Sequence, residues 1–103
     1  MYARVITFSG AGSDKRDAAL EMIRGTVVPM LRTFDGYEGY ILLTDEDRSR
    51  AQGIVLWDSE DAANAAEEKL AERRKEMVSQ VGTTIESVDL YEAPIVELEG
   101  ARV

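Results

Sequence analysis

The sequence contains neither cysteine nor histidine, and these two absences exclude several classes of protein. Without cysteine the chain can form no disulfide and can use no thiolate. Without histidine it lacks the commonest general base, the commonest metal ligand and the usual proximal haem ligand. We therefore expect a protein that works without a metal ion or another cofactor.

Basic residues are scarce, because 12 lysines and arginines face 20 aspartates and glutamates and leave a formal net charge of −8. This charge argues against sequence-independent binding to nucleic acid and against attraction to anionic membranes. No apolar run approaches the ~20 residues that span a bilayer. The first residues have the alternation of a strand and not the pattern of a signal peptide, so we expect a cytoplasmic protein.

The 103 residues fit one domain, and 45% apolar with 31% charged residues is ordinary for a folded globular protein. Four segments have the character of strands: 2–8, 37–44, 51–57 and 84–91. Two segments have apolar residues three and four apart, as amphipathic helices do: 14–33 and 59–80. This β-α-β-β-α-β order predicts an α+β ferredoxin-like sandwich, with an antiparallel four-stranded sheet and both helices on one face.

Two details of these elements are predicted from single residues. Pro29 lies inside the first helical segment, and its ring would clash with the carbonyl of Gly25 four residues earlier. We expect a kink there, with two short helices as the alternative. In the second strand, simple alternation predicts Tyr37 on the same face as Ile41 and Leu43.

The strands carry more apolar side chains than one covered sheet face requires. The second and third are apolar on both faces, and the first is nearly so. A bare face of roughly 400 Å² would rival the largest apolar patch of a typical monomer. We therefore expect a homodimer that pairs sheet to sheet, with a domain at 1–92 and an apolar C-terminal arm at 93–103 that contacts the partner. The alternative is a monomer whose arm folds back over its own sheet.

Several segments resemble the antibiotic biosynthesis monooxygenase-like domains of the dimeric α/β barrel superfamily. They are residues 29–32 (PMLR), 35–40 (DGYEGY), 55–62 (VLWDSEDA) and 88–92 (VDLYE). The most distinctive is the strand-end tryptophan followed by an acidic, alanine-rich helix start. The resemblance covers residues 1–92. It implies two ferredoxin-like subunits that form an α/β barrel, each with a pocket between its helices and its sheet.

The resemblance also implies a short list of functions. Some members of the superfamily oxidise aromatic polyketides with molecular oxygen and without metal or flavin, whereas others degrade haem with Asn, Trp and His. The absence of histidine excludes haem degradation and argues against the haem-binding barrel peroxidases. A cofactor-independent monooxygenase acting on a small aromatic or polyketide-like compound is one expectation. The other is a non-catalytic dimeric module that binds a small ligand or stabilises an assembly.

Five residues are candidates for the wall of such a pocket: Arg4, Tyr40, Trp57, Arg74 and Tyr91. Trp57 can wall an aromatic ligand, but a core anchor under the second helix is the favoured role. Tyr40 and Tyr91 can orient a quinol-type substrate through their hydroxyls, although a strand-end tyrosine with its hydroxyl in water is equally ordinary. No catalytic residue stands out from the sequence.

Arg4 lies in a strand that we expect at the centre of the sheet, where a charge needs a partner. An acid on the neighbouring strand, such as Asp89 or Glu86, is the favoured partner. The alternative is the carboxylate or enolate of a ligand.

The second helix carries two further arginines where its inward stripe should continue. Either Arg73 or Arg74 must therefore lie at the edge of the pocket or extend past it into water. Asn64 is rejected as a site residue, because its acidic helical neighbours place it on the wet face of the same helix.

Overall fold

The computed structural model describes residues 1–10 and 13–100. Its elements are β1 (Tyr2–Ser9), α1 (Ser13–Met22), η1 (Ile23–Val27), α2 (Val28–Leu31), β2 (Tyr37–Asp45), η2 (Glu46–Arg48), β3 (Arg50–Trp57), α3 (Glu60–Val81) and β4 (Thr84–Glu92). This order confirms the predicted ferredoxin-like sandwich. Among the described helices, none combines the length and the apolar character needed to cross a membrane.

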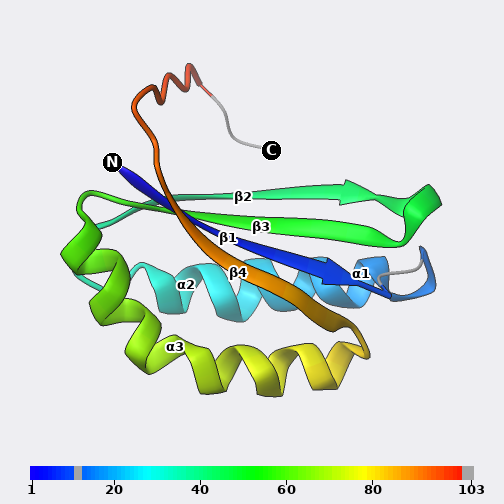
Figure 1. Ribbon diagram of the computed structural model, residues 1–103. Coiled ribbons are helices and arrows are strands. Elements are labelled where there is room, and N and C mark those ends of the chain that lie inside the picture. The colour runs from blue at the N-terminus through cyan, green and yellow to red at the C-terminus, as the bar shows by residue number, and fades with distance from the viewer. Residues whose placement is uncertain (11–12, 101–103) are drawn as a thin grey trace.

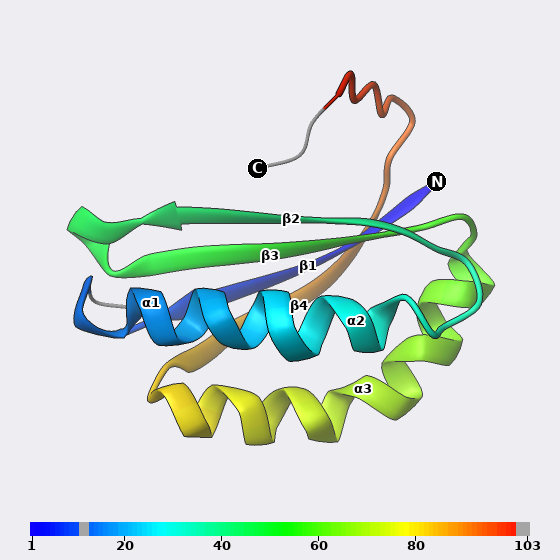
Figure 2. The same ribbon diagram turned by 180° about the vertical axis from the view of Figure 1, so that it is seen from behind.

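The four strands form one antiparallel sheet in the order β2-β3-β1-β4. Both helical segments cover the same face, and Figures 1 and 2 show α1–α2 and α3 running side by side beneath the sheet. The side chains of each strand alternate between this helix layer and the opposite, open face. The space between helices and sheet is therefore bounded by alternate residues of the strands.

The core lies between α3 and the central strands. Six buried apolar side chains form it: Leu31, Val55, Trp57, Ala63, Ala66 and Leu70. The small alanines allow α3 to lie close to the sheet. Ser59 caps the start of this helix, because its hydroxyl accepts a hydrogen bond of 3.1 Å from the N–H of Ala62. Gly82 ends it at a φ of 72°, a conformation that glycine adopts without strain.

The irregularity predicted near Pro29 is a change of helix type. In the π-helical segment η1 the helix widens, so that the N–H of Val28 donates to the carbonyl of Ile23, five residues earlier. Pro29 follows directly, at the start of α2. Figure 2 shows α1 and α2 as one continuous rod. The irregularity is thus a local widening of one helix and not a turn between two.

A bulge at the start of β2 changes the face that Tyr37 occupies. The register of β2 against β3 shifts between Tyr37 and Gly39. As a result, the Tyr37 ring meets the buried Trp57 on the helix side, with ring centroids 6.0 Å apart. The prediction that Tyr37 shares a face with Ile41 is wrong, because a bulge breaks the simple alternation of a strand.

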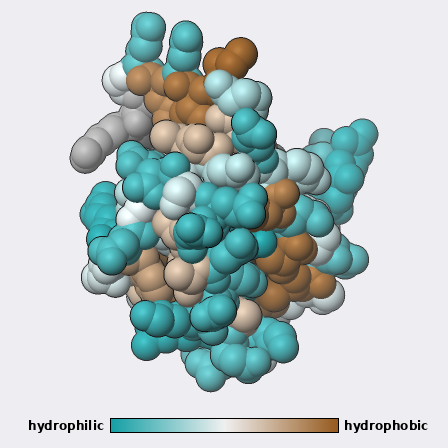
Figure 3. All heavy atoms as spheres, turned by 60° about the vertical axis from the view of Figure 1, so that its left-hand side comes forward, coloured by the Kyte–Doolittle hydropathy of each residue, from teal (hydrophilic) through white to brown (hydrophobic). Residues whose placement is uncertain are grey.

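The open face of the sheet and the C-terminal arm keep apolar side chains at the surface. Leu43 is 48% exposed and Tyr91 57% exposed on the open face. In the arm, Ile95 is 81% exposed and Leu98 59% exposed. Figure 3 shows hydrophobic surface at the top of the molecule, where the C-terminal segment lies in Figure 1. The described part of the arm therefore does not bury these two side chains on its own sheet.

Candidate functional site

A cavity of about 160 Å³ lies between the helix layer and the sheet. Its wall is mostly apolar, with residues that include Ile6, Phe8, Ile23, Leu42, Leu70 and Met77. An engineered apolar cavity of ~150 Å³ in another protein binds benzene, so a space of this size admits an aromatic ring. A mostly apolar space with a few polar groups is also the usual character of a small-molecule site.

Tyr40 brings a hydroxyl to the cavity wall. Its ring packs against the core from β2, and its hydroxyl reaches over Gly53 on β3, where an added Cβ would lie only 2.8 Å from the hydroxyl oxygen. Burial raises the pKa of Tyr40 to about 12, and the neighbouring Tyr37 acts in the same direction. The phenol therefore keeps its proton at neutral pH. It can donate a hydrogen bond to a ligand but cannot act as a base.

The charged part of the cavity wall is mainly cationic, although the whole chain carries a net charge of −8. Five cations and one carboxylate line it: Lys15, Arg16, Arg50, Arg73, Arg74 and Glu46. Carboxylates pair with three of these cations, namely Arg16 with Glu46 at 2.7 Å, Arg50 with Asp45 at 3.5 Å and Arg74 with Glu67 at 2.6 Å. Lys15 and Arg73 form no ion pair within the described part of the chain.

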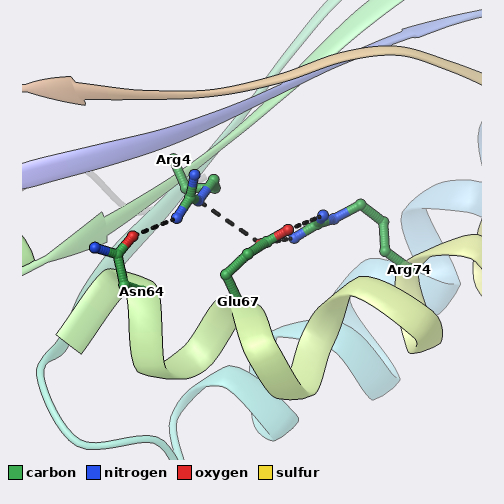
Figure 4. Close-up of polar contacts among 4 residues, drawn as sticks. All are labelled: Arg4, Asn64, Glu67 and Arg74. Atoms are coloured by element: carbon green, nitrogen blue, oxygen red, sulfur yellow. Dashed lines mark hydrogen bonds and ion pairs between the residues drawn. The ribbon is translucent and has the colours of Figure 1, made fainter. Parts of the chain in front are cut away.

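A polar cluster of four residues joins β1 to α3 beside the cavity (Figure 4). Glu67 lies between two arginines: its carboxylate accepts two hydrogen bonds from Arg74, at 2.6 and 2.8 Å, and lies 3.7 Å from Nε of Arg4. Arg4 also donates to the amide oxygen of Asn64 at 3.3 Å. The hydrogen bonds from Arg74 lower the pKa of Glu67 and, with the charges of both arginines, outweigh the effect of partial burial. The cluster is therefore an ionised bridge between sheet and helix.

The structure brings two of the five candidate residues, Tyr40 and Arg74, to the cavity. Arg4 faces α3, and its partners are Glu67 and Asn64. The predicted partners on the neighbouring strand are wrong for a geometric reason. Asp89 precedes Leu90, which packs into the core, and so lies on the opposite face of β4, while Glu86 accepts a hydrogen bond from Ser9.

Trp57 and Tyr91 do not line the cavity. Trp57 is 1% exposed and meets the rings of Phe34 and Tyr37 edge to face, so it anchors the core. Tyr91 follows the inward-facing Leu90 and therefore lies on the open face of the sheet. Neither ring belongs to the wall of this cavity.

The sequence did not predict the place of several polar residues in and beside the cavity. Asn64 is exposed, as its acidic neighbours predict, and it does not line the cavity, but its amide oxygen accepts a hydrogen bond from Arg4 that the sequence did not predict. Glu67 stands seven residues before Arg74, which is two helical turns and places both on one face, a signal that was available. Lys15 and Arg16 reach the cavity from the first turns of α1, and only the packing of that helix reveals this.

No protein-family model matches the sequence, and no curated protein matches it significantly. Its structure, by contrast, is similar to many solved structures, which include candidate antibiotic biosynthesis monooxygenases. The resemblance expected from the sequence is therefore confirmed in the fold.

Three solved structures illustrate the similarity. A monooxygenase of Streptomyces coelicolor in complex with nanaomycin D has a TM-score of 0.68 and 19% identity, over 97% of this chain and 92% of its own. SnoaB of Streptomyces nogalater, a cofactor-independent oxygenase, has a TM-score of 0.64 and 20% identity, over 95% of this chain and 97% of its own. A dimeric ferredoxin-like protein from an uncultured marine organism has a TM-score of 0.65 and 8% identity, over 95% of this chain and 98% of its own. The chain thus has the ferredoxin-like fold of antibiotic biosynthesis monooxygenase domain proteins.

Proposed function

We propose that this protein binds a small aromatic or polyketide-like compound in the cavity and oxidises it with molecular oxygen, without a cofactor. The observation that carries the proposal is the cavity itself, an apolar space whose wall holds a protonated phenol and several cations. Two proteins of the same fold support it, because one is a cofactor-independent oxygenase and the other is a monooxygenase that holds nanaomycin D.

In such a reaction the substrate supplies the electrons. An anthrone loses a proton from its ring CH₂ group and becomes an enolate, which passes electrons to O₂. One oxygen atom becomes the new ring carbonyl, and the other leaves as water with the two hydrogens of the CH₂ group. The protein has to exclude water, orient the anion and stabilise its charge. The hydroxyl of Tyr40 and the cations of the wall are the groups suited to this task.

We also propose that two chains pair through the open faces of their sheets. The exposed Leu43 and Tyr91 lie on that face, and the exposed Ile95 and Leu98 of the arm are available to cover a partner. Pairing about a two-fold axis would bury all of them at once. The dimeric ferredoxin-like protein of the same fold supports self-association.

Oxygen uptake with a panel of anthrones and quinols tests the proposed activity. We expect consumption above the rate of the same compounds in buffer. Tyr40→Phe should lower the rate of oxygen consumption by about ten- to a hundredfold, because a hydrogen bond to a charged group contributes ~1.5–3 kcal/mol. Tyr2→Phe makes the same chemical change away from the cavity wall and should leave the rate unchanged.

A non-catalytic binding module is the second candidate function. The one carboxylate of the cavity wall, Glu46, is paired with Arg16, and the Tyr40 phenol keeps its proton. Within the described residues, no free base therefore faces the cavity. If this second function is correct, oxygen uptake will stay at the buffer rate with every reduced aromatic, while aromatic ligands raise the melting temperature.

A further inference from the structure

We infer that the ligand of this cavity is an amphipathic anion, with an aromatic body inside the cavity and a carboxylate or similar oxyanion at its mouth, bound by Arg73. This inference rests on the proposed function, because it names the class of molecule that the proposed site takes. It follows from the sign of the charge, from the partners of each cation and from the apolar residues beside Arg73.

The sign of the charge is the first argument. Acidic residues outnumber basic ones by 20 to 12 in the chain, yet five cations and one carboxylate line the cavity. Three of the cations are engaged by carboxylates, which leaves Lys15 and Arg73. A neutral ligand makes no use of this excess of positive charge, whereas an anion is attracted by it.

Of these two cations, Arg73 has the weaker hydrogen-bond acceptor. Its guanidinium, on α3, donates a hydrogen bond of 2.9 Å to the thioether sulfur of Met30 on α2. A thioether is a weak acceptor, whereas a carboxylate forms charge-assisted and often bidentate hydrogen bonds with arginine. The Arg73 side chain is also exposed while lining the cavity, so it lies at the mouth, where an oxyanion can reach it from water.

Lys15 already has a structural partner. Its ammonium group donates to the carbonyl of Gly82 at 3.1 Å, where a positive charge complements the C-terminal end of α3. Arg73 lies nine residues before Gly82 on the same helix, which is roughly 13 Å along its axis at ~1.5 Å per residue. The two cations are therefore held at different parts of α3, and of the two only Arg73 has no oxygen acceptor within the described residues. The head group is therefore assigned to Arg73.

The place of the aromatic body follows from the residues one turn away. Leu70 and Met77 lie before and after Arg73 on α3, and both line the cavity. A carboxylate bound to Arg73 directs an attached ring against these apolar side chains. The cavity volume of about 160 Å³ admits such a ring.

Two probes of the same shape separate charge from size. 2-Naphthoate is an anion at pH 7, and 2-naphthamide is its neutral counterpart. By titration calorimetry with the full chain, we expect naphthoate to bind about tenfold more tightly than naphthamide. In Arg73→Gln the two Kd values should agree within twofold, with the naphthamide value unchanged. Arg24→Gln removes the same charge from an exposed position outside the cavity wall and should keep the tenfold preference.

The other outcomes distinguish this inference from the proposed function. If both probes bind the unaltered chain equally, or if Arg24→Gln also abolishes the preference, the inference is overturned and the cavity remains a binding site. If neither probe binds, the proposed function fails and the inference fails with it. Arg73→Lys keeps the charge and should retain a preference of at least threefold. Loss of the preference in this folded variant would also overturn the assignment.

Discussion

The position of the Tyr40 hydroxyl depends on the absence of a side chain at Gly53. An added Cβ would lie 2.8 Å from the hydroxyl oxygen. We expect Gly53→Ala to lower the free energy of unfolding by about 1–3 kcal/mol, as overpacking of a core does, in urea denaturation. Gly39→Ala is the matched control on β2, because its Cβ would lie at an ordinary 3.5 Å from Leu56.

Removing the Tyr40 hydroxyl tests whether its contact with the added Cβ causes the destabilisation by Gly53→Ala. In a Tyr40→Phe background the nearest ring carbon lies 3.6 Å from the added Cβ, an ordinary contact distance. The loss of unfolding free energy caused by Gly53→Ala should therefore fall by at least half. An equal cost in both backgrounds would mean that the hydroxyl does not lie over Gly53.

Glu67 compensates two arginines whose side chains are only 12% and 14% exposed. Because the fold lowers the pKa of Glu67, its contribution to stability is present above the ordinary glutamate pKa and is lost as the pH falls through the lower folded-state value. We expect Glu67→Gln to lower the free energy of unfolding by about 1–3 kcal/mol at pH 7 and by much less near pH 2. Denaturant titrations at several pH values measure this difference.

Glu68→Gln is the control for this titration, because its side chain is exposed and joins no ion pair among the described residues. It should change stability by less than ~0.5 kcal/mol at either pH. A loss in Glu67→Gln that is the same at pH 2 and pH 7 would contradict the ionised bridge between β1 and α3.

At the scale of the elements, η1 contains a glycine that its geometry does not require. A Cβ on Gly25 would meet nothing within 4 Å, and the residue is exposed. Glycine inside a helix is less favourable than alanine by ~0.5–1 kcal/mol, so Gly25→Ala should raise the free energy of unfolding by about this amount. Destabilisation in urea would instead show that the widened turn before Pro29 needs the freedom of glycine.

The order and the ends of the elements could be predicted from the sequence because they depend on local spacing. The apolar stripe with Ala63, Ala66 and Leu70 marks the buried face of α3, and each of these side chains is buried. The face of Tyr37 could not be predicted, because it depends on a bulge where β2 pairs with β3. The partner of Arg4 was missed for a similar reason, since it comes from a helix about sixty residues later in the chain.

The same limit applies to the candidate site at the scale of the whole molecule. A pocket between helices and sheet followed from the resemblance to a known fold, and Tyr40 and Arg74 line the cavity found there. The cationic character of its wall did not follow. Lys15 and Arg16 from α1, Arg50 from β3 and Arg73 from α3 lie far apart in the sequence and meet only through the packing of these elements.

The proposed pairing through the open sheet face predicts the mass in solution. Light scattering at micromolar concentration should give twice the 11.4 kDa of one chain. Leu43→Glu places a charge on that face, away from the cavity, and should shift the mass towards one chain. A mass of one chain for the unaltered protein would contradict the pairing.

The measurement that tests the proposed site most directly is a crystal structure of the protein with 2-naphthoate. We predict that the naphthalene ring lies between the sheet and the helices, within contact of Tyr40 and Leu70, and that the carboxylate lies against Arg73. A ring bound on the open face of the sheet, with side chains closed over the cavity, would contradict the proposed site.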